Sequence, residues 1–281
     1  MRGFSRIGIA LVLILNAAAE DKVFLKGSSV PTTGVILGME KNQIYVQIGE
    51  AGTTGLALAN VDRVEMAIPD SVTKGIQDAE AGKDAAAIAT LDPTVTNFLG
   101  LPVSWMEDAL LQLAQSYLAI QDWSNALERF SQLRTIYPQS PKLDMALAGE
   151  SLALYQLKQF DAARKELETL FQSHSTEMAL TADQNKALSR ASVLLGKCYL
   201  VAKQDDKALE AFLSATTLYY LDSDAVAEAQ FQSALLFEKI NKLPRARGQL
   251  EDLIQEHPLS PLVADAKKKL ESLPKIEKSP L

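Results

Sequence analysis

Between Trp105 and Pro138 the apolar residues recur every three or four positions, in two runs separated by a polar break. The first run holds Leu110, Leu113, Ala114, Tyr117 and Leu118, and the second holds Ala126, Leu127, Phe130, Leu133 and Ile136. This spacing predicts two amphipathic helices. Ser124 or Asn125 can cap the second helix, and Pro138 ends it. Two helices this short cannot bury both faces of each, so the hairpin needs neighbours.

The same pattern returns along the chain around four small residues, Ala126, Ala163, Ala208 and Ala246, at intervals of 37, 45 and 38 residues. A second small residue precedes each of them by twelve positions: Ala114, Ser151, Gly196 and Ala234. A large residue precedes each by nine positions: Tyr117, Leu154, Tyr199 and Phe237. Another large residue follows each by four positions: Phe130, Leu167, Phe212 and Leu250. Pro138 and Pro258 end the first and fourth units, whereas the second and third units have Ser175 and Tyr220 at that place.

This arrangement of small, aromatic and proline positions resembles the tetratricopeptide repeat (TPR). The resemblance implies a mainly α fold, a TPR-type α-solenoid of helical hairpins with repeats at about 105–138, 142–175, 184–220 and 224–258. A standard repeat has about 34 residues, and every interval here is longer. We therefore expect irregular stacking, most of all around residues 174–184.

Residues 22–68 follow a different period, in which apolar residues alternate with polar ones. Val35, Leu37 and Met39 form one alternating set, and Ile44, Val46 and Ile48 form another. Alternation predicts half-buried strands. The length and period resemble a small all-β, SH3-like or Sm-like barrel, with one helical turn at residues 60–62 before the last strand.

The remaining segments predict the ends of the helical array. Residues 71–102 read as a degenerate helical hairpin, broken at 82–84, and a connection from Asp92 to Pro102 that contains Pro93. Residues 261–273 predict a C-terminal capping helix, since repeat arrays need their ends covered. Residues 274–281 predict a disordered tail.

Residues 1–19 have the features of a secretory signal peptide: Arg2 and Arg6, then the apolar run 7–15, then Ala17-Ala18-Ala19. We expect cleavage after about Ala19 and export to a bacterial periplasm; an uncleaved membrane anchor is the alternative. The first 19 residues carry no acidic group, so cleavage changes the net charge from −7 to −9. Such an acidic chain is a poor partner for nucleic acid.

The chain lacks the motifs that predict an enzyme or a metal site. It has no glycine-rich phosphate loop and no G-x-S-x-G elbow. Cys198 is the single cysteine, and it predicts a buried small side chain. His174 predicts an exposed loop histidine, and His257 stands at a helix end. We expect no catalytic residues, no cofactor and no metal.

In a TPR array the first helix of each hairpin lines a concave groove. Mapping that face gives Leu111, Gln115, Leu118, Ala148, Leu152, Tyr155, Val193, Lys197, Leu200, Phe231, Leu235 and Glu238. A mixed strip of this kind fits an extended peptide or a helix laid in a groove. Alternatively, several of these apolar residues pack against the β domain or against a neighbouring helix.

Export and a repeat array together predict a non-catalytic scaffold that binds protein partners in the cell envelope. Exported chains of this kind resemble two bacterial groups: the TPR subunit of the outer-membrane β-barrel assembly machinery, and the periplasmic TPR protein that works with the Tol-Pal system. This chain lacks the lipid-anchored N-terminal cysteine of the first and the coiled coil of the second. Two alternatives are an envelope-polymer or ligand-binding module that uses the β domain, and a self-assembling structural protein.

Overall fold

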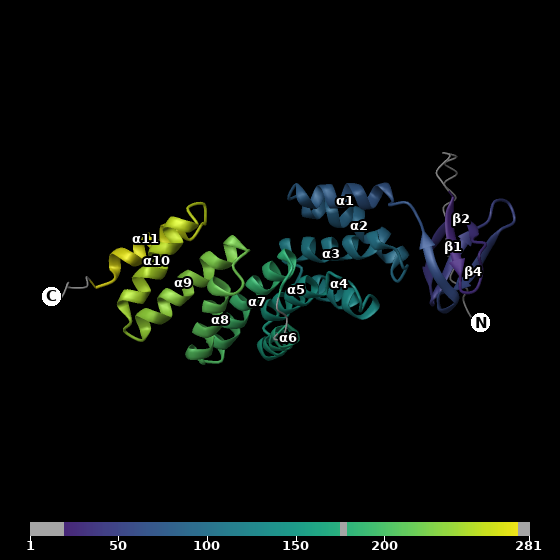
Figure 1. Ribbon diagram of the computed structural model, residues 1–281. Helices are drawn as coiled ribbons and strands as arrows, with labels where there is room; N and C mark the ends of the chain where they lie inside the picture. The colour runs from purple at the N-terminus through teal and green to yellow at the C-terminus, as the bar shows by residue number, and fades with distance from the viewer. Residues whose placement is uncertain (1–19, 175–178, 275–281) are drawn as a thin grey trace, which may run out of the picture. The chain divides into compact units, whose positions relative to one another are not determined.

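The computed structural model describes residues 20–174 and 179–274 (Figure 1). The predicted signal peptide and nearly all of the predicted tail lie outside the described residues. The chain divides into two compact units. One contains residues up to Ile68 together with Leu101–Val103, and the other contains Pro69–Gly100 and the chain from Ser104 onward.

The first unit is a five-stranded antiparallel sheet. Its strands are β1 (Asp21–Leu25), β2 (Thr32–Glu40), β3 (Gln43–Gln47), β4 (Thr53–Ala57) and β5 (Val61–Glu65), in the order β4-β3-β2-β1-β5. A 3-10 turn (Leu58–Asn60) precedes β5, two residues earlier than predicted. The described pairings leave β4 and β5 at the two edges of the sheet. The prediction of a small all-β domain is therefore confirmed as an antiparallel sheet, and these pairings do not close it into a barrel.

The alternating apolar residues of β2 face the opposite way from the prediction. Ile36 is buried, whereas Val35 and Leu37 are 57% and 40% exposed. The predicted partner strand is oriented as expected, with Ile44 and Val46 fully buried. Because Ile36 pairs with Val46 in the register of the sheet, it shares the buried face. Alternation shows which side chains share a face, but which face is covered depends on the whole sheet.

The second unit contains eleven helices among the described residues, arranged as consecutive antiparallel pairs and a final single helix. They are α1 (Asp70–Glu80), α2 (Asp84–Phe98), α3 (Ser104–Ala119), α4 (Trp123–Ile136), α5 (Leu143–Gln156), α6 (Phe160–Ser173), α7 (Ala182–Val201), α8 (Asp205–Thr217), α9 (Ser223–Lys239), α10 (Leu243–Glu256) and α11 (Val263–Ser272). Within this unit the first helices α3, α5, α7 and α9 contact one another in turn along the array.

The four predicted hairpins share one turn. Gln121, Lys158, Lys203 and Asn241 each have a left-handed backbone, with φ of 63°, 65°, 57° and 58°. The next residue then donates its N–H to the carbonyl five residues earlier, as Asp122 does to Tyr117 at 2.9 Å. This bond satisfies a carbonyl that the helix end would leave unpaired. Identical turns give each pair the same geometry.

The first pair, α1–α2, has the same turn. Gly82 has φ of 70°, and Lys83 donates its N–H to Asp78 at 2.8 Å. Counting from that turn places Ala87 at the small position of the repeat and Leu91 four residues later, and both are fully buried. A Cβ on Gly75, twelve residues before Ala87, would lie 2.5 Å from Leu91 Cγ. The pair is thus a fifth hairpin in register with the other four.

The predicted connection from Asp92 is wrong in its first part, because α2 continues through Pro93 to Phe98. A proline inside a helix removes a hydrogen bond and costs about 3 kcal/mol or more. Pro93 is exposed, while Leu91 and Val95 on either side of it are fully buried. Burial of Leu91 and Val95 offsets the free-energy cost of the proline. A prediction from the local sequence does not include that burial.

The large and small signature residues pack as the periodicity implies. The residues Ala126, Ala163, Ala208 and Ala246 and the residues Phe130, Leu167, Phe212 and Leu250 are all fully buried. Ala114, Ser151, Gly196, Ala234, Tyr117, Leu154 and Phe237 are buried as well, and Tyr199 is half-buried. At Gly196 a Cβ would lie 2.5 Å from Phe212 Cε1, so only glycine lets α7 approach α8 this closely.

The longest interval between repeats corresponds to a longer helix, α7, which begins at Ala182 behind a capping box formed by Thr181 and Gln184. His174, at the end of α6, is not the exposed loop residue that we predicted. Its side chain is 7% exposed, and Nε2 lies 3.0 Å from Asp144 Oδ1 in the first turn of α5. The end of α6 folds back onto α5, a contact between segments 30 residues apart.

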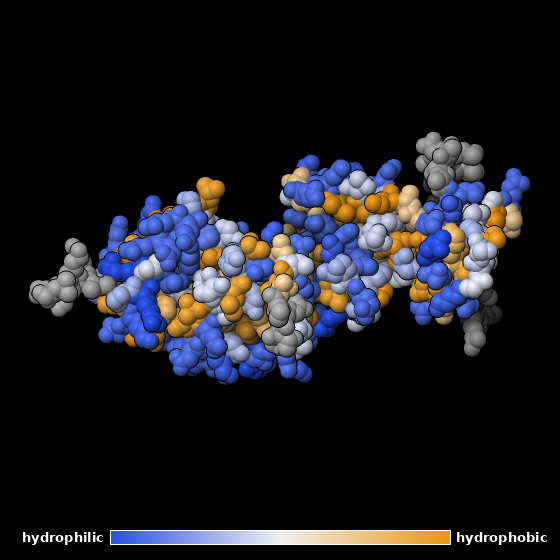
Figure 2. All heavy atoms as spheres, in the orientation of Figure 1, coloured by the Kyte–Doolittle hydropathy of each residue, from blue (hydrophilic) through white to orange (hydrophobic). Residues whose placement is uncertain are grey.

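The last helix, α11, follows the same turn that joins α4 to α5. Ser140 donates its N–H to Tyr137 at 3.0 Å, and Ser260 donates its N–H to His257 at 2.9 Å. The helix buries Ala266 and exposes Lys267, Lys268 and Glu271. The surface drawn over α9–α11 in Figure 2 is correspondingly mostly hydrophilic. A helix with one buried stripe and a charged outer face is suited to end an array.

A buried carboxylate, Glu150 on α5, joins three helices of the array. It accepts a hydrogen bond from Ser131 at 2.9 Å and lies 3.2 Å from Arg134, which also contacts Glu166 on α6 at 2.7 Å. Its second oxygen has no hydrogen-bond partner among the described residues. Burial raises the pKa of Glu150, although Ser131 and Arg134 lower it in part.

We expect Glu150→Gln to flatten the pH dependence of stability. Because the folded state holds the Glu150 proton more tightly than the unfolded state, the free energy of unfolding falls as pH rises above about 4.5. Denaturant melts of the wild type and of Glu150→Gln between pH 4.5 and 7.5 measure that slope. Glu210→Gln, at an exposed position of α8, is the control. An unchanged slope in Glu150→Gln would contradict the assignment.

Candidate functional site

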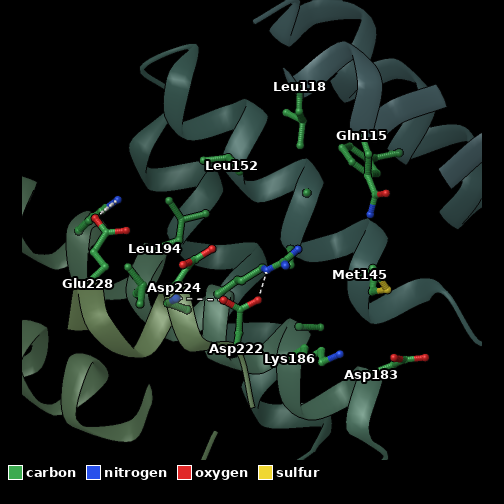
Figure 3. Close-up of a pocket in the computed structure, with 18 residues that line it drawn as sticks. Gln115, Leu118, Met145, Leu152, Asp183, Lys186, Leu194, Asp222, Asp224 and Glu228 are labelled. Atoms are coloured by element: carbon green, nitrogen blue, oxygen red, sulfur yellow. Dashed lines mark hydrogen bonds and ion pairs between the residues drawn. The ribbon is translucent and has the colours of Figure 1, made fainter. Parts of the chain in front are cut away.

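A cavity of about 560 Å³ lies among the first helices of the array (Figure 3). Its walls come mainly from α3, α5, α7 and the start of α9, the first helices of four successive pairs. The lining residues are Gln115, Leu118, Phe130, Met145, Ala148, Gly149, Leu152, Asp183, Lys186, Ala187, Arg190, Val193, Leu194, Lys197, Asp222, Asp224, Ala225 and Glu228. The site is therefore built by residues more than 100 positions apart.

One side of the cavity is apolar. Leu118 of α3, Leu152 of α5 and Leu194 of α7 come from three successive repeats, and Figure 3 shows Leu118 and Leu152 above the charged residues in that view. Met145 adds a flexible, polarisable side chain that adapts to a partner's shape. Leu118 and Leu152 remain partly exposed. This side offers contact area to apolar side chains of a partner.

The other side is charged and is held by two ion pairs between α7 and α9. Arg190 Nε lies 2.6 Å from Asp222 Oδ2, and Lys197 Nζ lies 2.6 Å from Glu228 Oε1. Asp222 also caps α9, because its Oδ1 accepts the Ala225 N–H at 2.9 Å. One carboxylate thus fixes both the start of α9 and its position against α7.

Asn185, in the first turns of α7, makes two hydrogen bonds to the loop between α8 and α9. Its side-chain amide donates to the Leu218 carbonyl at 3.2 Å, and its oxygen accepts the Leu221 N–H at 3.0 Å. Asn185 is 9% exposed, and both bonds are partly buried. The loop directly precedes Asp222, and the two bonds position the charged wall of the cavity.

We expect Asp222→Ala to destabilise the array by about 0.5–2 kcal/mol through loss of the helix cap alone. The ion pair adds little, because the Arg190 side chain is 61% exposed. Denaturant unfolding measures the loss. Asp222→Asn keeps the capping oxygen while removing the charge, and it should recover most of the stability. If both variants are equally unstable, the charge and not the cap is responsible.

Half of the residues predicted for the groove line the cavity: Gln115, Leu118, Ala148, Leu152, Val193 and Lys197. Leu111 is buried in α3 instead. Tyr155 is half-buried, with its ring 5.1 Å from that of Phe160, and burial raises the pKa of its hydroxyl. The remaining predicted residues lie in the third and fourth repeats and do not line the cavity. Leu200 and Phe231 pack against core clusters. Leu235 does not reach the cavity, and Glu238 pairs with Lys269.

Of the charged wall, only Lys197 is predicted from the sequence. Lys186 and Arg190 precede Val193 and Lys197 at helical spacing on α7, so the sequence does show the stripe. The predicted groove takes only the later part of that helix. Met145 and Leu194 are absent from the prediction, which takes about one residue from each helical turn. The cavity is lined by more than one residue per turn.

The described residues contain no group of three or more His, Cys, Asp and Glu side chains placed to hold a metal ion. Burial raises the pKa of the Cys198 thiol to about 11, so it stays protonated at neutral pH. His257 Nδ1 lies 2.7 Å from Ser223 Oγ, which links the end of α10 to α9. Across the described ranges, every helix is too short or too polar to cross a membrane.

Comparison with known proteins gave one family match and several similar solved structures. A tetratricopeptide repeat family model matches residues 108–140 and 228–260. The solved structure of TTC0263, a thermophilic TPR protein of Thermus thermophilus, is 19% identical with a TM-score of 0.49, covering 72% of this chain and 96% of that one.

MamA (41-end) from Desulfovibrio magneticus RS-1 is 17% identical with a TM-score of 0.48, covering 67% of this chain and 96% of that one. No curated protein matches the chain. The repeated turns, the buried small and large signature residues and the two matched segments agree on one kind of repeat. The chain carries tetratricopeptide repeats, in a helical array that follows a small five-stranded antiparallel sheet.

Proposed function

We propose that this chain is a non-catalytic scaffold that binds a segment of another protein in the cavity among its first helices. The observation that carries the proposal is the cavity itself, to which three successive repeats contribute a leucine and a fourth contributes charge. Tetratricopeptide repeats as a class bind protein segments, and a mixed apolar and polar groove suits an extended chain or an amphipathic helix.

The apolar side of the cavity supplies the binding energy in this proposal. Burial of apolar surface contributes about 25 cal/mol per Å². The partly exposed Leu118 and Leu152 offer such surface to partner side chains, beside Leu194, which is 5% exposed. The ion-paired side supplies hydrogen-bonding groups and excludes partners whose charges do not fit. Neither side has the arrangement of nucleophile, base and orienting group that catalysis requires.

Site-specific photo-crosslinking in cells tests the proposal. A photoreactive residue at Lys186, an exposed position of the lining, should capture one dominant protein that mass spectrometry identifies. The control places the same residue at Glu210, an exposed position of α8 outside the cavity lining. Equal capture at both positions, or capture at Glu210 alone, would remove the cavity as the binding site.

We further propose that the chain is exported and works in a bacterial envelope. The support is the charged start, apolar run and alanine-rich end of residues 1–19. N-terminal sequencing of the protein from fractionated cells tests this. A mature chain that begins near Glu20 in the periplasmic fraction is the expected result. An intact Met1 in a membrane fraction supports the anchor alternative, and an intact Met1 in the cytoplasm contradicts export.

A second binding function for the β domain is favoured by one observation. Val35 and Leu37 stand on the exposed face of β2, 57% and 40% exposed, although neighbouring apolar side chains on a sheet are usually covered. This fits the alternative in which the sheet binds an envelope polymer. Cosedimentation of the full chain with purified cell wall, compared with Val35→Ser/Leu37→Ser, distinguishes the two: only the polymer-binding function predicts a loss in the double variant.

A further inference from the structure

Ion pairs join neighbouring first helices at both ends of the array. Lys142, at the start of α5, lies 3.1 Å from Asp108 of α3, and three more pairs follow from α7 onward. Arg190 pairs with Asp222 and Lys197 with Glu228, both between α7 and α9, each at 2.6 Å. Glu238 of α9 pairs with Lys269 of α11 at 2.5 Å. We call these three pairs the ion-pair ladder. Each joins neighbouring first helices, and together they run from α7 to the end of the array.

The gap between α5 and α7 is different. In the part of the chain that the structure describes, no ion pair links these two helices, and the cavity opens there between Leu152 and Leu194. The cavity lining ends at Glu228, at the second pair of the ladder. Phe231 and Leu235, one and two turns further along α9, do not line it, and Phe231 packs into the core beneath.

The ladder leaves few charges for a partner to neutralise. Its three cations and three carboxylates are each matched within the chain. A charged partner side chain placed there must either displace one member of a pair or lie beside a like charge, and both cost free energy. Neutral polar groups can still hydrogen-bond to the exposed edges of the paired groups. Asp183, Lys186 and Asp224 add exposed charges to the cavity lining, two acidic and one basic.

Resting on the proposed function, we infer that the ladder sets the end of the binding footprint and so determines what is bound. The footprint spans α3, α5 and α7. Its occupant is a protein segment with a short apolar run, which fills the space around Leu118, Leu152 and Leu194, followed by neutral polar residues that meet the ladder at Lys197 and Glu228. A longer apolar run would bury the paired charges of the ladder, which costs free energy. The ladder therefore selects against such segments.

The test uses the full chain and a phage-displayed library of random 12-residue peptides as the probe. The most enriched peptides are synthesised, and their Kd values are measured by fluorescence anisotropy with the native chain, Leu152→Ala and Leu235→Ala. Leu235→Ala is the matched control, since Leu235 stands eleven residues before Ala246, as Leu152 does before Ala163, but lies outside the cavity lining. Far-UV circular dichroism verifies that each variant is folded.

We expect Leu152→Ala to weaken binding at least tenfold and Leu235→Ala less than twofold. Affinity should change less than about threefold between 50 and 500 mM NaCl, since a peptide with neutral polar residues brings no charge to the cavity for salt to screen. In Lys197→Met/Glu228→Met the preferred peptides should carry a longer apolar run, while the charge-exchanged Lys197→Glu/Glu228→Lys should keep the native preference.

Three outcomes overturn the inference while leaving the proposed function intact. These are equal losses in Leu152→Ala and Leu235→Ala, a steep dependence on salt, or an unchanged peptide preference in Lys197→Met/Glu228→Met. A different outcome overturns the proposed function as well: selected peptides that bind Leu118→Ala and Leu152→Ala as tightly as the native chain, or no enriched peptide at all, would show that the cavity is not a peptide site.

Discussion

Replacement of Phe212 by alanine is expected to lower the free energy of unfolding by about 3–5 kcal/mol. The Phe212 ring is fully buried in α8 and lies against the bare backbone of Gly196, where even a Cβ would approach Cε1 to 2.5 Å. Gly196 has no side chain that could fill the space, so part of the cavity left by the ring stays open. The apolar area lost and the unfilled volume both destabilise the fold.

The loss should be local before it is global. Each hairpin of a repeat array contacts only its neighbours, so the hairpins next to the lesion lose protection first. Hydrogen exchange read by mass spectrometry should show faster exchange in α7–α10 than in α3–α4, alongside a lower denaturant midpoint. Phe212→Leu is the control and should cost less than about 1.5 kcal/mol. Uniformly faster exchange along the whole array would show that the hairpins unfold as one unit.

Gly149→Ala should destabilise the array, although alanine is ordinarily the better helix former. In an exposed helix the change would stabilise by about 1 kcal/mol. At Gly149 a Cβ would lie 2.3 Å from Cζ of Phe130, closer than van der Waals contact allows. The ring is fully buried, and three of its atoms would lie within 2.7 Å of that Cβ. Overpacking of this kind costs about 1–3 kcal/mol.

Two variants make this second prediction specific. Gly248→Ala, on α10, is the matched control: its Cβ would have no neighbour within 4 Å, so it should be neutral or stabilising. Phe130→Leu should relieve the clash. The double variant Gly149→Ala/Phe130→Leu is therefore expected to lose less than the sum of the two single losses, with a coupling of about 0.5–3 kcal/mol. Additive losses in that thermodynamic cycle would mean that the two residues do not clash.

The repeats could be predicted from the sequence because their determinants are local. The left-handed turn residue, the small residue five positions later and the large residue after that all lie within about one hairpin. The burial of Ala126, Ala208 and Phe212 follows from their spacing. The first pair, α1–α2, is predicted as a degenerate hairpin, and its register with the other repeats needed the structure, because it has Asp78 where they have an aromatic or aliphatic residue. Its glycine turn shows it to be in register all the same.

The candidate site was predicted only in part, and the errors have one cause. The helical period predicts which residues share a face, but not which of them line the cavity. Leu118 and Leu152 line the cavity, whereas Leu235 on the equivalent face of α9 does not. The cavity lining ends at Glu228, where ion pairs between residues 31 or 32 positions apart in sequence join α7 to α9 and α9 to α11.

The sequence alone determined which residues form the hairpins, where each turn lies and which side chains make the core, since those depend on spacing within a few turns of helix. The tertiary structure decided that α2 continues through Pro93, that Ile36 and not Val35 faces inward, and that His174 lies against Asp144. It also decided where the groove ends. Each of these depends on burial and pairing between segments far apart in the chain, and such contacts leave no periodic trace in the sequence.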